Sequence, residues 1–94
     1  MAERLLLIED EEKLARMVEL ELQYEGYQVE KALDGRTGLE RALSGEFDLI
    51  LLDIMLPALS GMEVLRRLRR ESQVPVIMLT ARDTVVDKVS GLDM

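Results

Sequence analysis

The chain has 94 residues and is 48% hydrophobic, which is enough for one small domain with its own core. Its formal net charge of -7 argues against non-specific binding to nucleic acid or to an anionic membrane surface, and the lack of cysteine and histidine excludes disulfides, Cys–His zinc sites and His-based catalytic triads. Because no apolar stretch approaches the length of a membrane span and the first residues lack a signal-peptide pattern, we expect a cytoplasmic protein.

Strand and helix patterns alternate along the first part of the chain, which predicts βαβ units and a parallel sheet. The apolar residues 5–8 predict a first strand at 4–8. Helical spacing follows, with an apolar face made of Leu14, Met17, Val18 and Leu22. Glu19 lies off that face in this interpretation, and Gly26 ends the helix. The alternating residues 27–32 predict a second strand at an edge of the sheet.

The next elements begin with recognisable turn and cap residues. Asp34 and Gly35 mark a turn and a helix cap, and residues 48–53 predict a third strand. Ser60 and Glu63 have the spacing of a capping box, which predicts a third helix. The buried face of that helix is expected to contain Val64, Leu65 and Leu68. The arginines at 66, 67, 69 and 70 are interpreted as its solvated face rather than a nucleic-acid patch, because the whole chain is acidic.

The end of the chain predicts a fourth strand at 76–79 and a fourth helix that begins near Asp83. A right-handed crossover would lead such a helix to another parallel strand, and the sequence contains no candidate for it. We therefore expect residues 1–94 to form a domain that is incomplete at its C-terminus.

Three buried strands are each followed by residues capable of phosphoryl chemistry. Glu9 and Asp10 follow the first strand, Asp53 ends the third, and Thr80 follows the fourth. The carboxyl ends of parallel strands share one edge of a sheet, where open α/β sheets bind ligands. Crowding carboxylates there is costly unless a cation joins them. For each residue alone, a helix cap or a solvated loop residue is the competing interpretation.

These residue types predict transfer of a phosphoryl group to a carboxylate. Asp53 is the candidate nucleophile, forming an aspartyl-phosphate. Mg²⁺ or Mn²⁺ would be held by the carboxylates of Asp10 and Asp53 and by the backbone carbonyl of Met55, with Glu9 holding a metal-bound water. Thr80 would offer its hydroxyl to a phosphoryl oxygen.

Three separated motifs resemble the receiver domain of bacterial two-component response regulators, of the OmpR/PhoB type. They are Leu7-Ile8-Glu9-Asp10-Glu11, Asp53-Ile54-Met55-Leu56-Pro57 with Gly61 four residues later, and Leu79-Thr80-Ala81-Arg82. The resemblance implies a doubly wound, flavodoxin-like parallel sheet of order 2-1-3-4-5, with the fifth strand missing from this chain.

The resemblance also implies how the site works. Asp53 would accept a phosphoryl group from a sensor histidine kinase, Mg²⁺ would be served by Glu9, Asp10, Asp53 and the Met55 carbonyl, and Thr80 would be the switch hydroxyl. The full-length protein would control transcription. Such a receiver is a phosphoacceptor rather than an enzyme, with autocatalytic phosphotransfer at most.

The sequence departs from the family's pattern after the fourth strand. The family's fifth-strand lysine and switch aromatic are not among these 94 residues, nor is the surface through which the family dimerises. We therefore expect slow or undetectable phosphorylation, and self-association through the exposed edge of the fourth strand.

Three alternative functions remain open at this point. One is an inactive structural or interaction fragment of a receiver. A second is an Asp-nucleophile phosphatase of the haloacid-dehalogenase type, although Met55 stands where such enzymes have a second aspartate. The third is a Rossmann-like nucleotide-binding domain, which the acidic residues 9–12 disfavour, because they would repel a pyrophosphate.

Overall fold

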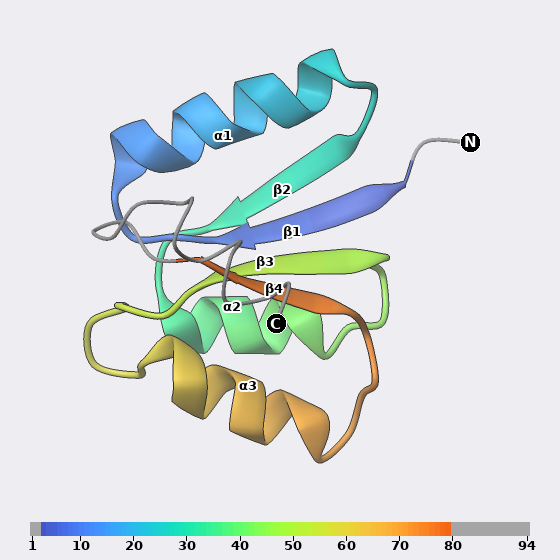
Figure 1. The fold of residues 1–94 in the computed structure, drawn as a ribbon. Coiled ribbons are helices and arrows are strands. Elements are labelled where there is room, and N and C mark those ends of the chain that lie inside the picture. The colour runs from blue at the N-terminus through green and yellow to red at the C-terminus, as the bar shows by residue number, and fades with distance from the viewer. Residues whose placement is uncertain (1–2, 80–94) are drawn as a thin grey trace, which may run out of the picture.

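Strands and helices alternate through the part of the chain that the structure, a computed structural model, describes, namely residues 3–79. Figure 1 shows their arrangement. In chain order the elements are β1 (Arg4–Ile8), α1 (Glu12–Tyr24), β2 (Gln28–Ala32), α2 (Gly35–Ala42), β3 (Leu49–Asp53), α3 (Gly61–Arg69) and β4 (Val76–Leu79). The predicted fourth helix and Thr80 lie outside the described residues.

The strands form one parallel sheet in the order β2-β1-β3-β4, which confirms the predicted order. The predicted edge position of β2 is therefore correct, and β4 is the strand at the other end of the described sheet. In the central pair, Ile8 of β1 lies opposite Leu52 of β3. Both strands consequently end side by side, and the residues that follow Ile8 begin next to Asp53.

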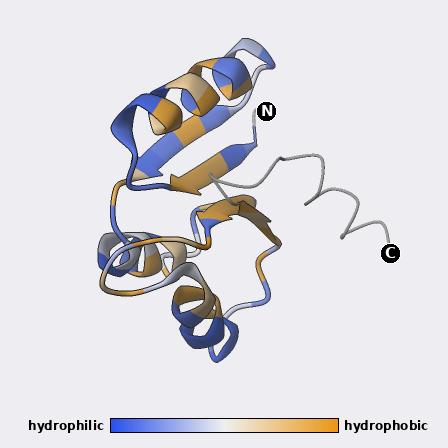
Figure 2. Ribbon diagram, turned by 60° about the vertical axis from the view of Figure 1, so that its left-hand side comes forward, coloured by the Kyte–Doolittle hydropathy of each residue, from blue (hydrophilic) through white to orange (hydrophobic). Residues whose placement is uncertain are grey.

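Helices cover both faces of the sheet, with α1 on one side and α2 and α3 on the other (Figure 1). The core accordingly has two parts. The larger lies under α2 and α3 and includes Leu6, Ile8, Ile50, Leu52, Val64 and Leu68, and the smaller lies under α1 and includes Leu7, Ala15 and Leu51. Successive residues of β1 and β3 point to opposite faces, so a strand covered on both sides is apolar throughout. Figure 2 shows these strands in orange between helices with hydrophilic outer residues.

The buried face of α1 differs from the prediction. Met17 is 59% exposed, whereas Glu19, which was placed off the apolar face, is buried. Ala15 defines the side that packs on the sheet, because it is fully buried. At about 100° per residue, Met17 is about 200° around the helix from Ala15, and Glu19 only about 40°. Val18 and Leu22 of the predicted face do pack against the smaller core, so the prediction fails only at Met17 and Glu19.

The predicted helix caps are present. Asp34 accepts a hydrogen bond of 2.7 Å from the backbone N–H of Thr37 at the start of α2. Ser60 accepts one of 3.3 Å from Glu63 N–H at the start of α3. The Glu63 carboxylate accepts hydrogen bonds from Arg66 and Arg67 instead of returning to Ser60. The capping box is thus half formed, and Glu63 instead pairs with two arginines on the exposed face of α3. Among residues 3–79, none of the helices is long and apolar enough to cross a membrane.

Candidate acidic metal site

The structure brings three acidic side chains together at the carboxyl ends of β1 and β3. One carboxylate oxygen each of Glu9, Asp10 and Asp53 lies within 4.8 Å of the other two. Glu9 is 2% exposed and Asp53 is 1% exposed, while Asp10 lies at the surface. The parallel pairing of β1 with β3 places these residues, which are more than forty positions apart in sequence, at one edge. Thr80, the fourth residue predicted for this edge, is outside the described residues.

Backbone hydrogen bonds hold the two buried carboxylates in place. The Glu9 carboxylate accepts a 2.9 Å hydrogen bond from the backbone N–H of Glu11. Oδ1 of Asp53 accepts a 3.0 Å hydrogen bond from the N–H of Met55. Both bonds turn the chain sharply after a strand, so the strand end, the carboxylate and the following loop form one unit.

The electrostatics of the cluster favour a cation. Burial raises the pKa of Glu9 to about 7; the Glu11 N–H opposes this shift, and the charges of Asp53 and Asp10 add to it. None of the ion pairs found among residues 3–79 includes Glu9, Asp10 or Asp53. Two buried carboxyl groups therefore face a third with no basic side chain paired to them in the described part of the chain.

The donor set fits a hard divalent cation. Mg²⁺ and Mn²⁺ prefer carboxylate, carbonyl and water oxygens and retain several waters, which suits a site with one exposed member. Met55 supplies a fourth candidate oxygen. Its N–H is bonded to Asp53, and within residues 3–79 no backbone N–H donates to its carbonyl. Its carbonyl oxygen, which follows directly in the chain, is thus left available as a candidate ligand.

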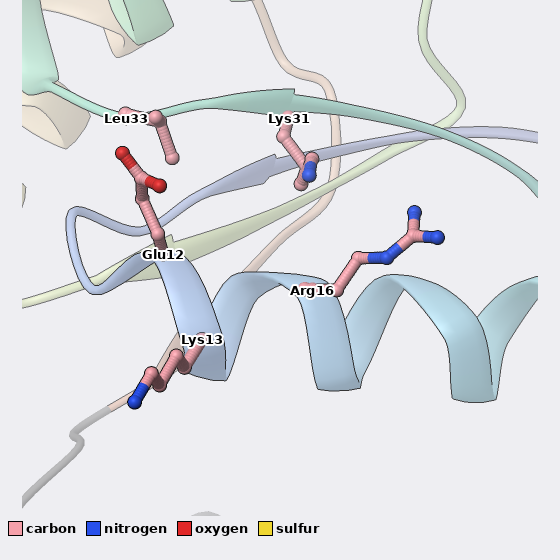
Figure 3. A pocket seen from close by; sticks show the side chains of 5 residues that line it. All are labelled: Glu12, Lys13, Arg16, Lys31 and Leu33. Atoms are coloured by element: carbon pink, nitrogen blue, oxygen red, sulfur yellow. The ribbon is translucent and has the colours of Figure 1, made fainter.

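Apart from the acidic cluster, a hollow with mostly basic side chains lies between α1 and β2. It is lined by Glu12, Lys13, Arg16, Lys31 and Leu33. Figure 3 shows Lys13 pointing away from β2, while Arg16 and Lys31 extend into the space between helix and strand.

Two of the three basic side chains of this hollow, Arg16 and Lys31, share one acidic partner. Oε1 of Glu19 accepts from Arg16 at 3.0 Å and forms an ion pair with Lys31 at 3.2 Å. Burial opposes ionisation of Glu19, but these two cations outweigh it and lower its pKa. The group fastens α1 to the edge strand β2. Sequence reasoning missed it, although a glutamate on a helix followed by a lysine on the next strand is the available signal.

Comparison with known proteins decides the family. The profile of the response regulator receiver domain matches residues 5–94. The chain belongs to this family. It is 59% identical over 91 residues to the uncharacterized transcriptional regulatory protein YkoG of Bacillus subtilis, and 50% identical over 90 residues to the response regulator ArlR of Staphylococcus saprophyticus. Each match covers 96% of this chain, so the similarity extends along nearly all of its length.

The chain spans about 40% of the length of these relatives, with 40% of YkoG and 41% of ArlR covered. Two solved structures show the same receiver fold. The response regulator TrrA of Thermotoga maritima in complex with Mg²⁺-BeF has a TM-score of 0.81 at 34% identity, and the match covers 96% of this chain and 79% of TrrA. TrrA in complex with the histidine kinase ThkA has a TM-score of 0.79 at 36% identity, covering 87% and 72%. The receiver assignment and its fold are therefore confirmed.

Proposed function

We propose that this receiver domain takes up a phosphoryl group on Asp53, as the input step of a response regulator that controls transcription. The observation that carries the proposal is the position of Asp53. It is the last residue of the central strand β3, it is 1% exposed, and it lies against Glu9 and Asp10. A carboxylate held in this way is a fixed nucleophile at the ligand-binding edge of the sheet.

The hydrogen bond from Met55 N–H gives the two carboxylate oxygens of Asp53 different roles. Oδ1 accepts that bond, which orients the carboxylate. One lone pair of the other oxygen, Oδ2, would attack the phosphorus atom: an O–P bond forms on Asp53 while the bond between phosphorus and the donor atom breaks, and the donor leaves with the electron pair. Phosphoryl transfer depends mainly on positioning and charge neutralisation, and the rigid strand end provides the first.

The residues that would hold the metal are Glu9, Asp10 and Asp53, together with the carbonyl of Met55. Bound there, Mg²⁺ would offset the negative charge of the phosphoryl oxygens. Glu9 would hold a metal-bound water. It is buried and its pKa is about 7, so its charge depends on pH near neutrality. The complex of TrrA with Mg²⁺-BeF supports this part of the proposal.

The proposed phosphoryl donor is a sensor histidine kinase, which the complex of TrrA with ThkA supports. Thr80 stays in the proposal as the switch hydroxyl. We also propose that the protein is cytoplasmic. Because the net charge of the chain is -7, we propose that it does not bind nucleic acid. Control of transcription would belong to a longer protein, by analogy with the transcriptional regulatory protein YkoG.

Phosphotransfer to the purified chain tests the proposal. We expect incubation with acetyl phosphate or a phosphorylated histidine kinase, in the presence of Mg²⁺, to add one phosphoryl group at Asp53, detected by intact mass and peptide mapping. Asp53→Asn should remain unlabelled, and removal of Mg²⁺ with a chelator should stop labelling. A phosphoryl group on another residue would contradict the assignment. No label after prolonged incubation would favour the alternative of an inactive interaction fragment.

A further inference from the structure

The loop between β3 and α3, residues 54–60, contains the Met55 carbonyl and is held at both ends. Met55 N–H binds the Asp53 side chain at 3.0 Å, and Gly61 N–H donates to the carbonyl of Ile54 at 3.1 Å. A Cβ at Gly61 would overlap the backbone carbonyl of Asp53, so α3 starts directly against the strand end. In the middle of the loop, Leu56 is buried in the core. The loop has little freedom to move as a whole.

A third constraint comes from α2, which is distant from this loop in sequence. A Cβ added at Gly35, the first residue of α2, would overlap the carbonyl oxygen of Leu59 and lie 3.2 Å from its Cβ. The positive-φ glycines among the described residues are Gly26 and Gly45, so Gly35 has no need of glycine for its backbone angles. The missing side chain serves close approach: α2 can press its first turn against the loop only because position 35 lacks a Cβ.

We propose that the N-terminus of α2 positions the metal-binding loop, with Gly35 as the positioning residue that sets where the Met55 carbonyl lies relative to Glu9, Asp10 and Asp53. The inference rests on the proposed function, because it assumes that the acidic cluster binds a divalent cation. It adds that the turn after β2, at the far edge of the sheet, controls the affinity of that site.

Displacement of Leu59 would be passed back along the loop to Met55. A side chain at position 35 can be accommodated only if the Leu59 backbone moves away from α2. Gly61 cannot follow freely, because it lies against the Asp53 carbonyl. The movement must therefore be absorbed by residues 55–58. Ala58 already has a left-handed φ of 62°, which leaves that part of the loop few alternative conformations.

The cap of α2 supports the same contact. Asp34 accepts hydrogen bonds from Thr37 N–H at 2.7 Å and Thr37 Oγ1 at 3.1 Å, and its carbonyl accepts from Gly38 N–H. These bonds order the turn that carries Gly35. Loss of the cap would loosen the first turn of α2 and with it the surface on which Leu59 rests.

Mn²⁺ binding, measured by the loss of the free-ion electron paramagnetic resonance signal, tests the inference without reference to activity. We expect Gly35→Ala to weaken Mn²⁺ binding by about tenfold, the lower range for loss of an outer-shell partner. The matched control is Ala42→Gly, a buried position at the other end of α2, about two turns from Gly35. It perturbs the same helix and should leave Mn²⁺ affinity unchanged. Equal affinities of Gly35→Ala and the unaltered chain would overturn the proposal.

A second pair of variants keeps the test decisive if Gly35→Ala does not fold. Asp34→Ala removes the cap and the charge, whereas Asp34→Asn removes the charge and keeps a capping oxygen. We expect Asp34→Ala to weaken Mn²⁺ binding several-fold and Asp34→Asn to restore it. Equal losses in both would mean that charge alone matters, which contradicts positioning by the helix. Failure of the unaltered chain to bind Mn²⁺ would instead refute the metal site of the proposed function, and the positioning role with it.

Discussion

The carboxylate of Asp53 accepts a 3.0 Å hydrogen bond from the N–H of Met55, the residue whose carbonyl oxygen is the fourth candidate metal donor. One peptide segment thus orients the nucleophile and presents a ligand beside it. The arrangement couples metal binding to the orientation of Asp53, because a movement of the Met55 backbone displaces both its N–H and its carbonyl oxygen. Phosphorylation and metal affinity should therefore change together in variants of the loop.

Asp10→Ala should abolish measurable Mg²⁺ binding in isothermal titration calorimetry. Asp10 is the exposed member of the cluster, so its removal takes away a ligand without opening the core. The effect should exceed the roughly 10–100-fold loss that follows removal of an outer-shell partner. Glu12→Ala is the control: it removes an equal charge from the same acidic run, at an exposed position outside the cluster. Unchanged affinity in Asp10→Ala would refute the assignment.

The metal-free chain should lose stability as the pH rises from about 5 to about 8. The pKa of Glu9 is about 7 in the folded chain against 4.5 for the unperturbed group, so the folded state binds the proton more tightly. The contribution of Glu9 to the free energy of unfolding is fully present below pH 4.5 and is lost as the pH rises through 7. The total loss is at most on the order of 3 kcal/mol. Urea unfolding with a chelator present measures it.

Glu9→Gln is the matched variant for this pH dependence. It should unfold with a nearly constant free energy over the same pH interval, and it should be more stable than the unaltered chain at pH 8, because no buried charge forms. Added Mg²⁺ should restore stability to the unaltered chain at pH 8 by compensating the carboxylates. Stability that increases between pH 5 and pH 8 without metal would contradict the raised pKa.

Lys31→Ala should destabilise the chain by about 1 kcal/mol, the upper end of the usual loss for an ion pair near the surface. Lys31 pairs at 3.2 Å with the buried Glu19, and Arg16 remains as a second partner, which limits the loss. Lys13→Ala is the control, because Lys13 lines the same hollow but points away from β2 (Figure 3). The free energy of unfolding of Lys13→Ala should stay within about 0.5 kcal/mol of that of the unaltered chain. Equal effects of the two variants would show that the Glu19 group does not fasten α1.

Ala58→Gly should stabilise the chain by about 1 kcal/mol, because Ala58 has a left-handed φ of 62° that disfavours a Cβ. Gly45→Ala is the reciprocal control. Gly45 has a φ of 79° and no neighbouring atom within 4 Å of an added Cβ, so the variant should lose a similar amount by conformation alone. Thermal unfolding of both variants measures the pair. A destabilised Ala58→Gly would mean that the loop needs the Ala58 side chain.

Self-association through β4 also stays a prediction. In the described sheet β4 is a terminal strand, and Ile77 on it is 40% exposed. Light scattering after size exclusion, at micromolar concentration, should detect a dimer or larger species. Ile77→Lys should reduce it, because a lysine on an edge strand opposes pairing, while Met17→Lys on the exposed side of α1 should not. A monodisperse monomer would contradict the prediction.

The alternation of short apolar runs with helical spacing determined the βαβ architecture without reference to coordinates. Uniformly apolar runs marked β1, β3 and β4 as strands covered on both faces, and the alternating run at 27–32 marked β2 as an edge strand. The interpretation was correct for β1, β3 and β2, because burial on one or two faces acts directly on which residues a strand can carry. It failed for β4, which is only partly buried among the described residues. Position after a buried strand also selected Glu9, Asp10 and Asp53 as candidates.

Tertiary structure alone decided which groups meet and at what energetic cost. Sequence spacing placed Met17 on the apolar face of α1 and Glu19 off it, and both assignments were wrong because the phase of α1 is set by Ala15 packing on the sheet and by the cations that reach Glu19. The distance between carboxylates, the raised pKa of Glu9 and the contact of Gly35 with Leu59 likewise depend on residues far apart in sequence. Such properties arise from close packing between segments far apart in the chain, which local residue patterns do not determine.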